Sequence, residues 1–350
     1  MINPRFSLGG RTKVFPEDFV VDEIWKESVF TTDLPDPGSA GDAPPSKQPG
    51  TVGEYLHFTL VKKDWTTVKL LQVMSDRLHV SLKRFGFSGM KDKRALTAQR
   101  ISVWHLEADR LGRLRVKDAW VKDLGYSNER ITLGQASGNR FTVTIRDISH
   151  DQAKTREILE GFEQATRKDR IPNFFGEQRL EGGNVEVGNA IVAGDLKQAV
   201  DTMLLKVQPY LGSGLDSIPD VFWTETRVLQ HLQDHPNDYA GALRRIPKKI
   251  LRIFTHSVQS QSFNDALMGA IQKGEVPEKL EIGGFPVPRM PELSTISIQR
   301  NSYLSMTGFE ILRIEENIAQ IRFSLGTGEY ATTMLSQLGV ETREKRERTD

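Results

Sequence analysis

A period of two between apolar and polar residues predicts β-strands in the first half of the chain. The segment Phe19–Trp25 is rich in β-branched and aromatic residues and follows the turn Pro16-Glu17-Asp18. The same pattern predicts strands at Tyr55–Lys62, Gln99–His105, Ile131–Leu133 and Phe141–Ile148. Because these strands follow one another closely, antiparallel pairing is favoured over βαβ units.

Two helices are predicted among these strands. Thr66 or Thr67 caps the first, and Pro172 ends the second, which covers Asp151–Arg170. The apolar stripe of the first helix consists of Val68, Leu71, Met74 and Leu78. The first half of the chain is therefore expected to have an α+β fold.

Helical periodicity dominates from about Gly182 to Gly274. The predicted helices are Asn189–Leu205, Phe222–Gln233 and Tyr239–Gln272, and prolines interrupt them. Strand patterns return at Ile296–Ile298, Gly308–Ile314 and Ala319–Ser324. This order predicts a helix-rich module inserted into a sheet domain whose last strands come from the C-terminal part of the chain.

Two segments carry neither pattern. Residues 31–51 contain five prolines and three glycines and few apolar side chains, which is typical of a mobile loop. Residues 341–350 form a charged tail that we expect to fray.

Composition narrows the class of protein. A length of 350 residues favours about two domains, and no apolar run is long enough to span a membrane, so we expect a cytoplasmic protein. The chain has no cysteine, which excludes disulfides, thiolate metal sites and cysteine nucleophiles. His231 and His235 share a helix face but lack the glutamate of a metalloprotease motif, and we interpret them as two surface histidines.

Positive charge is concentrated locally. The net charge of the chain is +1, but residues 62–100 contain ten basic and three acidic residues, a net charge of +7. Residues 244–252 form a second basic cluster. Such surfaces bind phosphate backbones through the release of counterions. The alternative interpretation is the solvated face of an ordinary protein.

The segment Gly86–Thr97 places one carboxylate, Asp92, among three cations and after two glycines. Nearby positive charge keeps such an aspartate ionised, so it could act as a nucleophile or a base toward a polyanionic substrate. The alternative is an exposed charged turn held by local ion pairs.

Two further segments contain more polar and aromatic residues than a core needs. Asn139 and Phe141 are two residues apart and share a strand face, where an amide can read a base edge and a ring can stack on the base. Taken alone, a phenylalanine such as Phe141 is more often part of a hydrophobic core. The segment Pro172–Arg179 contains two aromatic rings, two amides and an arginine, a composition typical of binding loops.

These segments resemble the motifs of one family. Gly89–Thr97 resembles the signature G-x-K-D-[KR]-x-A-x-T of the TruD family of tRNA pseudouridine synthases. Gly138–Thr142 is similar to its G-N-x-F-T element, and Pro172–Arg179 to its P-N-[YF]-F-G-x-Q-R element. Weaker similarities are found at Lys13, at Ser262-Phe263-Asn264 and at Tyr330-Ala331-Thr332.

The resemblance implies an isomerase that converts a tRNA uridine to pseudouridine, with uridine 13 as the usual bacterial target. It implies no metal or other cofactor, tRNA as the partner, and no obligate protein partner. It also implies a mostly antiparallel pseudouridine-synthase catalytic sheet flanked by helices, formed by residues 1–180 and 296–340. A helix-rich α/β domain, the TRUD domain, is then inserted at residues 181–295. We expect a monomer.

By position, Asp92 corresponds to the catalytic aspartate of the family. The other residues that the resemblance assigns to the substrate site are Lys13, Phe19, Lys91, Asn139, Phe141, Asn173, Phe175, Gln178, Arg179 and Tyr330. Tyr330 departs from the pattern, because Glu329 precedes it where a small residue is usual. The alternatives are a non-catalytic tRNA-binding protein and an unrelated small-molecule enzyme with a basic turn. Turnover that depends on the Asp92 carboxylate distinguishes the isomerase from the tRNA-binding protein.

Overall fold

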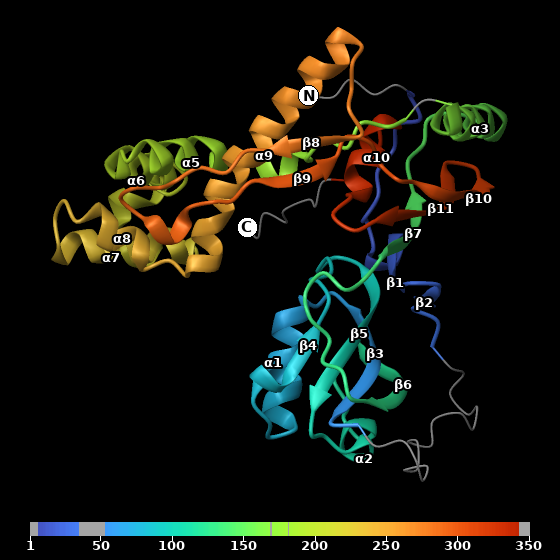
Figure 1. Ribbon diagram of the computed structural model, residues 1–350, viewed down its shortest axis with the longest axis horizontal. Coiled ribbons are helices and arrows are strands. Elements are labelled where there is room, and N and C mark those ends of the chain that lie inside the picture. Colours follow the sequence, from blue (N-terminus) through green and yellow to red (C-terminus); the bar gives the residue numbers. More distant parts are fainter. Residues whose placement is uncertain (1–5, 35–52, 169, 181, 343–350) are drawn as a thin grey trace. The chain divides into compact units, whose positions relative to one another are not determined.

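The computed structural model describes residues 6–34, 53–168, 170–180 and 182–342. Most of the loop predicted at 31–51 and most of the charged tail lie outside these residues. The chain divides into two compact units (Figure 1). The first, which we call the sheet unit, comprises residues 1–171 and 304–350, and the second, the inserted unit, comprises residues 172–303. The domain boundaries predicted from the sequence lie at 180/181 and 295/296. That the inserted domain folds by itself within these boundaries stays a prediction.

The sheet unit is built on one mixed sheet. Its strands are β1 (Phe19–Trp25), β2 (Ser28–Phe30), β3 (Tyr55–Lys63), β4 (Phe85–Phe87), β5 (Leu96–Trp104), β6 (Ala119–Ser127), β7 (Gly138–Ile145), β10 (Thr307–Glu315) and β11 (Ile318–Gly326). Their order is β10-β11-β7-β1-β5-β3-β6, with β2 paired to β1 and β4 to β5. The β1–β5 pair is parallel and the other described pairs are antiparallel, so the predicted α+β class with a mostly antiparallel sheet is confirmed.

Helices cover this sheet at two separate cores. The helices of the sheet unit are α1 (Thr67–Arg77), α2 (Ala108–Gly112), α3 (Gln152–Lys168) and α10 (Ala331–Gln337). One core packs Leu70, Leu71 and Met74 of α1 against apolar side chains of β3 and β5. The other packs α3 and α10 against β1, β7 and β11.

Polar residues lie between the two cores on the same face of the sheet. The cross-strand register pairs Lys62 of β3 with Thr97 of β5, and Thr97 with Val21 of β1. It also pairs Val21 with Phe141 and Glu23 with Asn139 of β7. Because residues paired across strands project from one face, the polar Lys62 and Thr97 continue the row of the core residues Val21 and Phe141, and Glu23 and Asn139 lie in the adjacent row.

Three local predictions were wrong. Residues 131–133 are not a strand: Ile131 is buried in a loop, and its N–H donates to Oγ of Ser102 at 3.0 Å. Val68 is 39% exposed, because the cap at Thr66 turns Thr67 and Leu70 toward the core instead. The predicted helix Asn189–Leu205 is two helices, since Gly194 has a left-handed φ of 79°.

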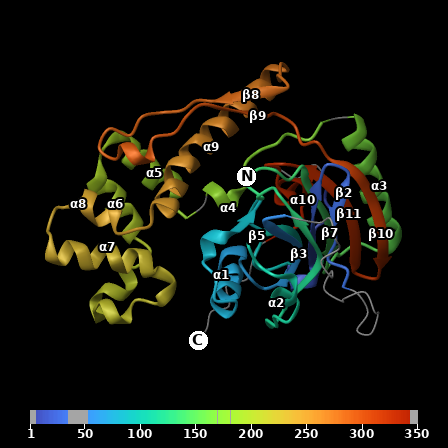
Figure 2. The same ribbon diagram turned by 60° about the horizontal axis from the view of Figure 1, so that its bottom comes forward.

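The inserted unit is mainly helical. Its helices are α4 (Glu177–Leu180), α5 (Asn184–Ala193), α6 (Leu196–Leu204), α7 (Trp223–Asp234), α8 (Tyr239–Arg244) and α9 (Lys248–Lys273), and its antiparallel strands are β8 (Lys279–Ile282) and β9 (Ile298–Asn301). The short helices α5–α8 gather around the first half of α9, where Leu251 and Phe254 join their core (Figure 2). No helix among the described residues is long and apolar enough to cross a membrane.

Candidate active site

Asp92 lies in the segment Ser88–Ala95, which connects β4 to β5 without helix or strand. Its side chain is 51% exposed, and Oδ2 accepts a hydrogen bond from Nζ of Lys13 at 2.8 Å. The Lys13 side chain is only 8% exposed, and its ammonium also lies 4.3 Å from the centre of the Phe19 ring. The fold therefore brings together an accessible carboxylate and a buried cation that are 79 residues apart.

Buried side chains hold the main chain of this segment from beneath. Nζ of Lys62 donates to the carbonyl oxygen of Asp92 at 2.7 Å, and Nε2 of Gln99 donates to that of Gly89 at 3.0 Å. Thr67 donates its hydroxyl hydrogen to Oε1 of Gln99 at 2.8 Å. Lys62, Thr67 and Gln99 are all buried. The segment is thus fixed to β3, β5 and α1 by side-chain hydrogen bonds.

The ammonium of Lys91 faces a buried carboxylate rather than solvent. Nζ of Lys91 lies 2.7 Å from Oε1 of Glu23, and the Glu23 side chain is fully buried. Oε2 of Glu23 accepts from the indole N–H of Trp25 at 3.1 Å and from the backbone N–H of Arg100 at 2.8 Å. Each oxygen of this carboxylate therefore has a donor, which offsets the cost of burying its charge.

Burial changes the proton affinity of Lys62. Desolvation lowers the pKa of its ammonium from 10.5 to about 8, and the positive charge of Lys91 acts in the same direction. The negative charges of Asp92 and Asp64 oppose this shift. Lys62 therefore remains mostly charged at neutral pH although it is buried.

The predicted base-stacking rings lie in the hydrophobic core. Phe141 is 7% exposed and stacks on Phe323 with ring centres 5.4 Å apart, and Phe19, 1% exposed, meets Phe141 edge-on at 5.8 Å. Beside them, Oδ1 of Asn139 is buried and has no hydrogen-bond partner among the described residues. This oxygen is an acceptor that the described part of the protein leaves unused.

Glu329, which departs from the family pattern, has a structural explanation. Its carboxylate is 7% exposed and accepts hydrogen bonds from the backbone N–H groups of Ser305 and Gly326, both at 2.9 Å. It thereby holds the turn that precedes α10. Tyr330, 37% exposed, occupies the N-cap position of that helix.

The remaining predicted residues belong to the inserted unit, where several of them meet. The amide of Asn173 donates to the carbonyl of Asn301 at 3.0 Å and accepts from Arg300. The guanidinium of Arg300 lies 4.0 Å, and that of Arg179 5.0 Å, from the centre of the Phe175 ring. The side chain of Gln178 lies outside the described residues.

Asn264 of α9 was missed as a supporting residue. Oδ1 of Asn264 accepts from the N–H of Phe175 at 2.8 Å, and Nδ2 donates to the carbonyl of Phe175 at 3.0 Å. Its signal in the sequence was the weak similarity at Ser262-Phe263-Asn264. Asp92 belongs to the sheet unit and Phe175 to the inserted unit, so the candidate residues fall into two groups, one in each unit.

The basic window at 62–100 does not form one solvated surface. Lys62 is buried, the side chain of Lys91 is only 8% exposed, and Arg84 and Arg100 donate to backbone carbonyls. Lys69, Lys83 and Lys93 are exposed.

The interpretation of His231 as a surface residue was wrong. It is 8% exposed, its Nε2 lies 2.8 Å from Oδ2 of Asp238, and its Nδ1 accepts from Nε of Arg245 at 3.1 Å. His231 lies on the buried face of the amphipathic helix α7. Asp238 and Arg245 form hydrogen bonds with its two ring nitrogens. His231 therefore connects α7 to α8.

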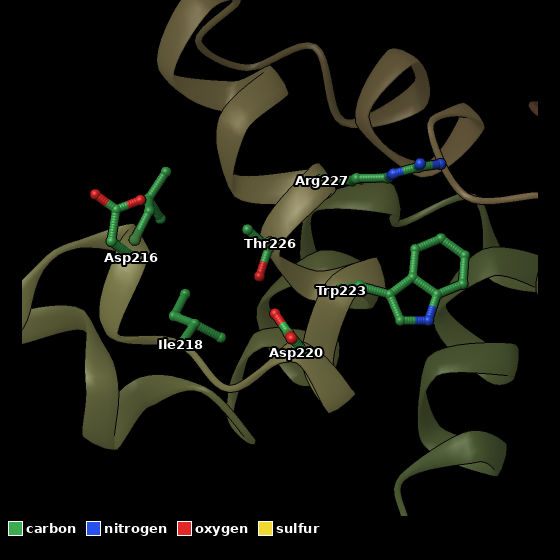
Figure 3. A pocket seen from close by; sticks show the side chains of 7 residues that line it. Asp216, Ile218, Asp220, Trp223, Thr226 and Arg227 are labelled. Carbon is green, nitrogen blue, oxygen red and sulfur yellow. The ribbon is translucent and has the colours of Figure 1, made fainter.

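A cavity of about 360 Å³ lies in the inserted unit and contains none of the predicted site residues (Figure 3). Asp216 and Asp220 contribute carboxylates to its wall. The guanidinium of Arg227 lies 4.9 Å from the ring centre of Trp223 at another side of it.

Comparison with known proteins identifies the family of this chain. The family model of tRNA pseudouridine synthase D (TruD) matches residues 5–281, which is most of the chain. The chain belongs to the TruD family. A tRNA pseudouridine synthase D of Syntrophotalea carbinolica is 30% identical over 276 residues, covering 73% of this chain and 63% of that protein.

Further TruD relatives cover different shares of the chain. A Methanosarcina acetivorans protein is 34% identical over 292 residues, which cover 76% of this chain, and the chain spans 61% of the length of that relative. A Methanopyrus kandleri protein is 29% identical and is covered over 86% of its length. A crystal structure of TruD from Methanosarcina mazei has a TM-score of 0.67 at 25% identity and covers 96% of this chain and 95% of that one.

Proposed function

We propose that this TruD protein is a tRNA pseudouridine synthase in which Asp92 is the catalytic carboxylate. The observation that carries the proposal is the geometry at Asp92: a half-exposed carboxylate, fixed through its main chain, lies 2.8 Å from a buried lysine ammonium. The names of the relatives support a tRNA substrate. No group from outside the chain is needed to supply a nucleophile or base at this place.

The reaction moves one bond within a uridine. The N1–C1′ glycosidic bond breaks, the uracil turns, and a C5–C1′ bond forms while C5 loses its proton and N1 gains one. The Asp92 carboxylate attacks C1′ as the bond to N1 breaks and is displaced again when C5 bonds to C1′. Alternatively, it removes the 2′ proton so that a glycal forms, and returns this proton to C2′ when C5 bonds to C1′. In either route uracil departs as an anion, and a cation such as Lys13 stabilises that charge.

Recognition of the base is assigned to Asn139. A buried acceptor without a partner is costly, and the N3–H of an extruded uracil would satisfy Oδ1 of Asn139. Cytosine has no hydrogen at N3 and would leave the oxygen unsatisfied.

We further propose that the target is a single tRNA uridine of the position-13 class and that the protein acts as a cytoplasmic monomer. The roles of Lys13, Phe19, Lys91, Phe141, Asn173, Phe175, Gln178, Arg179 and Tyr330 in binding the RNA remain part of this proposal.

Release of tritium from tRNA labelled at C5 of uridine tests the function, because C5 loses its hydrogen when the new bond forms. We expect release by the wild type, none by Asp92→Asn, and retained tRNA binding in both. Asp64→Asn, which changes another exposed carboxylate of the same basic window, serves as the control and should release tritium at the wild-type rate. A tRNA with cytidine at position 13 should lose the signal.

A wild type that binds tRNA but releases no tritium from any uridine would favour the non-catalytic tRNA-binding protein. Release that persists in Asp92→Asn would leave the family reaction in place but remove Asp92 from it.

A further inference from the structure

A small number of hydrogen bonds determines the position of Asp92. Ser88–Ala95 has no regular hydrogen-bond ladder, and few backbone groups bond to it, so neighbouring side chains also hold its main chain. Thr67 accepts from the N–H of Lys91 at 3.2 Å, Gln99 holds the carbonyl of Gly89, and Lys62 holds the carbonyl of Asp92 itself. Lys62 is thus the anchor on the residue that carries the carboxylate.

The stability of the fold does not explain why Lys62 is buried. The residue is 0% exposed, and within the described part of the chain no carboxylate oxygen lies within 4.0 Å of its ammonium. A buried charge without such a partner costs free energy that an apolar side chain of similar volume would not cost. Positions 56, 58 and 60 on the same face of β3 are apolar, so this strand offers the alternative in its own sequence.

Different lysines bind the main-chain carbonyl and the side-chain carboxylate of Asp92. Lys62 reaches the main-chain carbonyl from the sheet, whereas Lys13 reaches the carboxylate. Lys62 lies on β3 and is paired across the strands with Thr97 of β5. A rigid element therefore sets where the reactive oxygen atoms lie relative to the sheet.

We propose that Lys62 is a positioning residue, whose buried ammonium holds the main chain of Asp92 so that the carboxylate stays in reacting position beside Lys13. This inference rests on the proposed function of Asp92. Displacing a reacting group by about 1 Å can lower the rate roughly 100-fold even when binding is intact. The loss should therefore appear in kcat rather than in KM.

The test compares Lys62→Met, Lys62→Gln and the control Thr59→Val in the full-length protein. Methionine keeps the volume of the side chain but removes the donor, and glutamine keeps a neutral donor. Thr59 is a buried polar residue of the same strand, projects from its other face, and contacts Arg100 rather than the Asp92 segment. Tritium release gives kcat and KM for tRNA, and amide hydrogen exchange of the peptide that covers residues 88–95 reports the order of the segment.

We expect Lys62→Met to lower kcat roughly 10- to 100-fold with KM nearly unchanged, and to exchange faster than the wild type over residues 88–95. Lys62→Gln should lose less on both measures, and Thr59→Val should match the wild type. If Lys62→Met does not fold, the comparison of Lys62→Gln with Thr59→Val decides. A wild-type kcat in the Lys62 variants, or a lower kcat without faster exchange over residues 88–95, would overturn the inference.

The two proposals fail in different ways. If the wild type releases no tritium from any tRNA, the proposed function fails, and hydrogen exchange alone then decides whether Lys62 anchors the segment. If the wild type is active and Asp92→Asn is not, the function stands, and the Lys62 variants decide the positioning role separately.

Discussion

Buried charged residues surround the Asp92 segment and determine what a single substitution does there. The ion pair between Glu23 and Lys91 is almost fully buried, whereas the pair between Glu17 and Lys63 is partly exposed. Removing one member of a buried pair leaves the other charge without compensation, but solvent screens an exposed pair. The same chemical change should therefore have very different effects at the two places.

Glu23→Gln should lower the free energy of unfolding by about 3–5 kcal/mol, because the ammonium of Lys91 then stays buried without a counter-charge. Urea denaturation followed by circular dichroism measures it. Glu17→Gln is the matched control and should cost less than about 1 kcal/mol. Equal losses in the two variants would show that the Glu23–Lys91 pair is not what stabilises the segment.

Single residues were predicted unevenly from the sequence. Asp92 was singled out because it stands among cations after two glycines, and the structure shows its carboxylate exposed beside Lys13. Lys62 was counted as part of a basic surface, although its position in the alternation after Leu56, Phe58 and Leu60 puts it on the covered face of the strand. The sequence signal for its burial was a lysine on the apolar face of a predicted strand. Counting the charges in a window of the chain does not reveal this position.

At the scale of elements, the alternation of apolar and polar residues predicted some strands of the sheet and missed others. Phe19–Trp25 is a strand from the first to the last predicted residue. The edge strand β6 was not predicted, because apolar and polar residues alternate only weakly along it. The end of a strand or helix also depends on partners far along the chain, as at Ile131, which Ser102 holds in a loop.

Asn264 connects two elements of the inserted unit, and its loss should loosen them. Asn264→Leu removes both hydrogen bonds to the backbone of Phe175 and should destabilise the protein by about 2–4 kcal/mol. The control, Gln261→Leu, lies on the same helix, where its amide bonds the exposed Asp265. It should cost less than about 0.5 kcal/mol in the same denaturation experiment. A similar small loss for Asn264→Leu would show that water replaces the two bonds.

At the scale of the whole molecule, the two units have separate cores. The core of the inserted unit is formed by residues between Val187 and Leu293. Its ends also meet, since the backbone of Asn173 donates to the carbonyl of Ser302 at 2.8 Å. The sequence predicted an insertion from its change of periodicity, but the pairing at the ends involves single residues that no periodicity marks.

Residues 172–303 expressed alone should therefore fold with a helical circular dichroism spectrum and one cooperative thermal transition. A shorter fragment, 181–295, follows the boundaries predicted from the sequence and is the comparison. It lacks β9 and the Asn173–Ser302 bond, and we expect its midpoint to be several degrees lower. Equal midpoints would favour the shorter boundaries.

The strand order has a consequence for synthesis on the ribosome. β11 lies between β10 and β7, so β7 cannot acquire this neighbour until residues 318–326 have emerged. At roughly 5–20 residues per second, the delay after β7 is on the order of ten seconds. During that time the inserted segment is complete and can fold, while β7 presents an unpaired edge to other chains. The nascent chain is thus most exposed to aggregation just before its last strands appear.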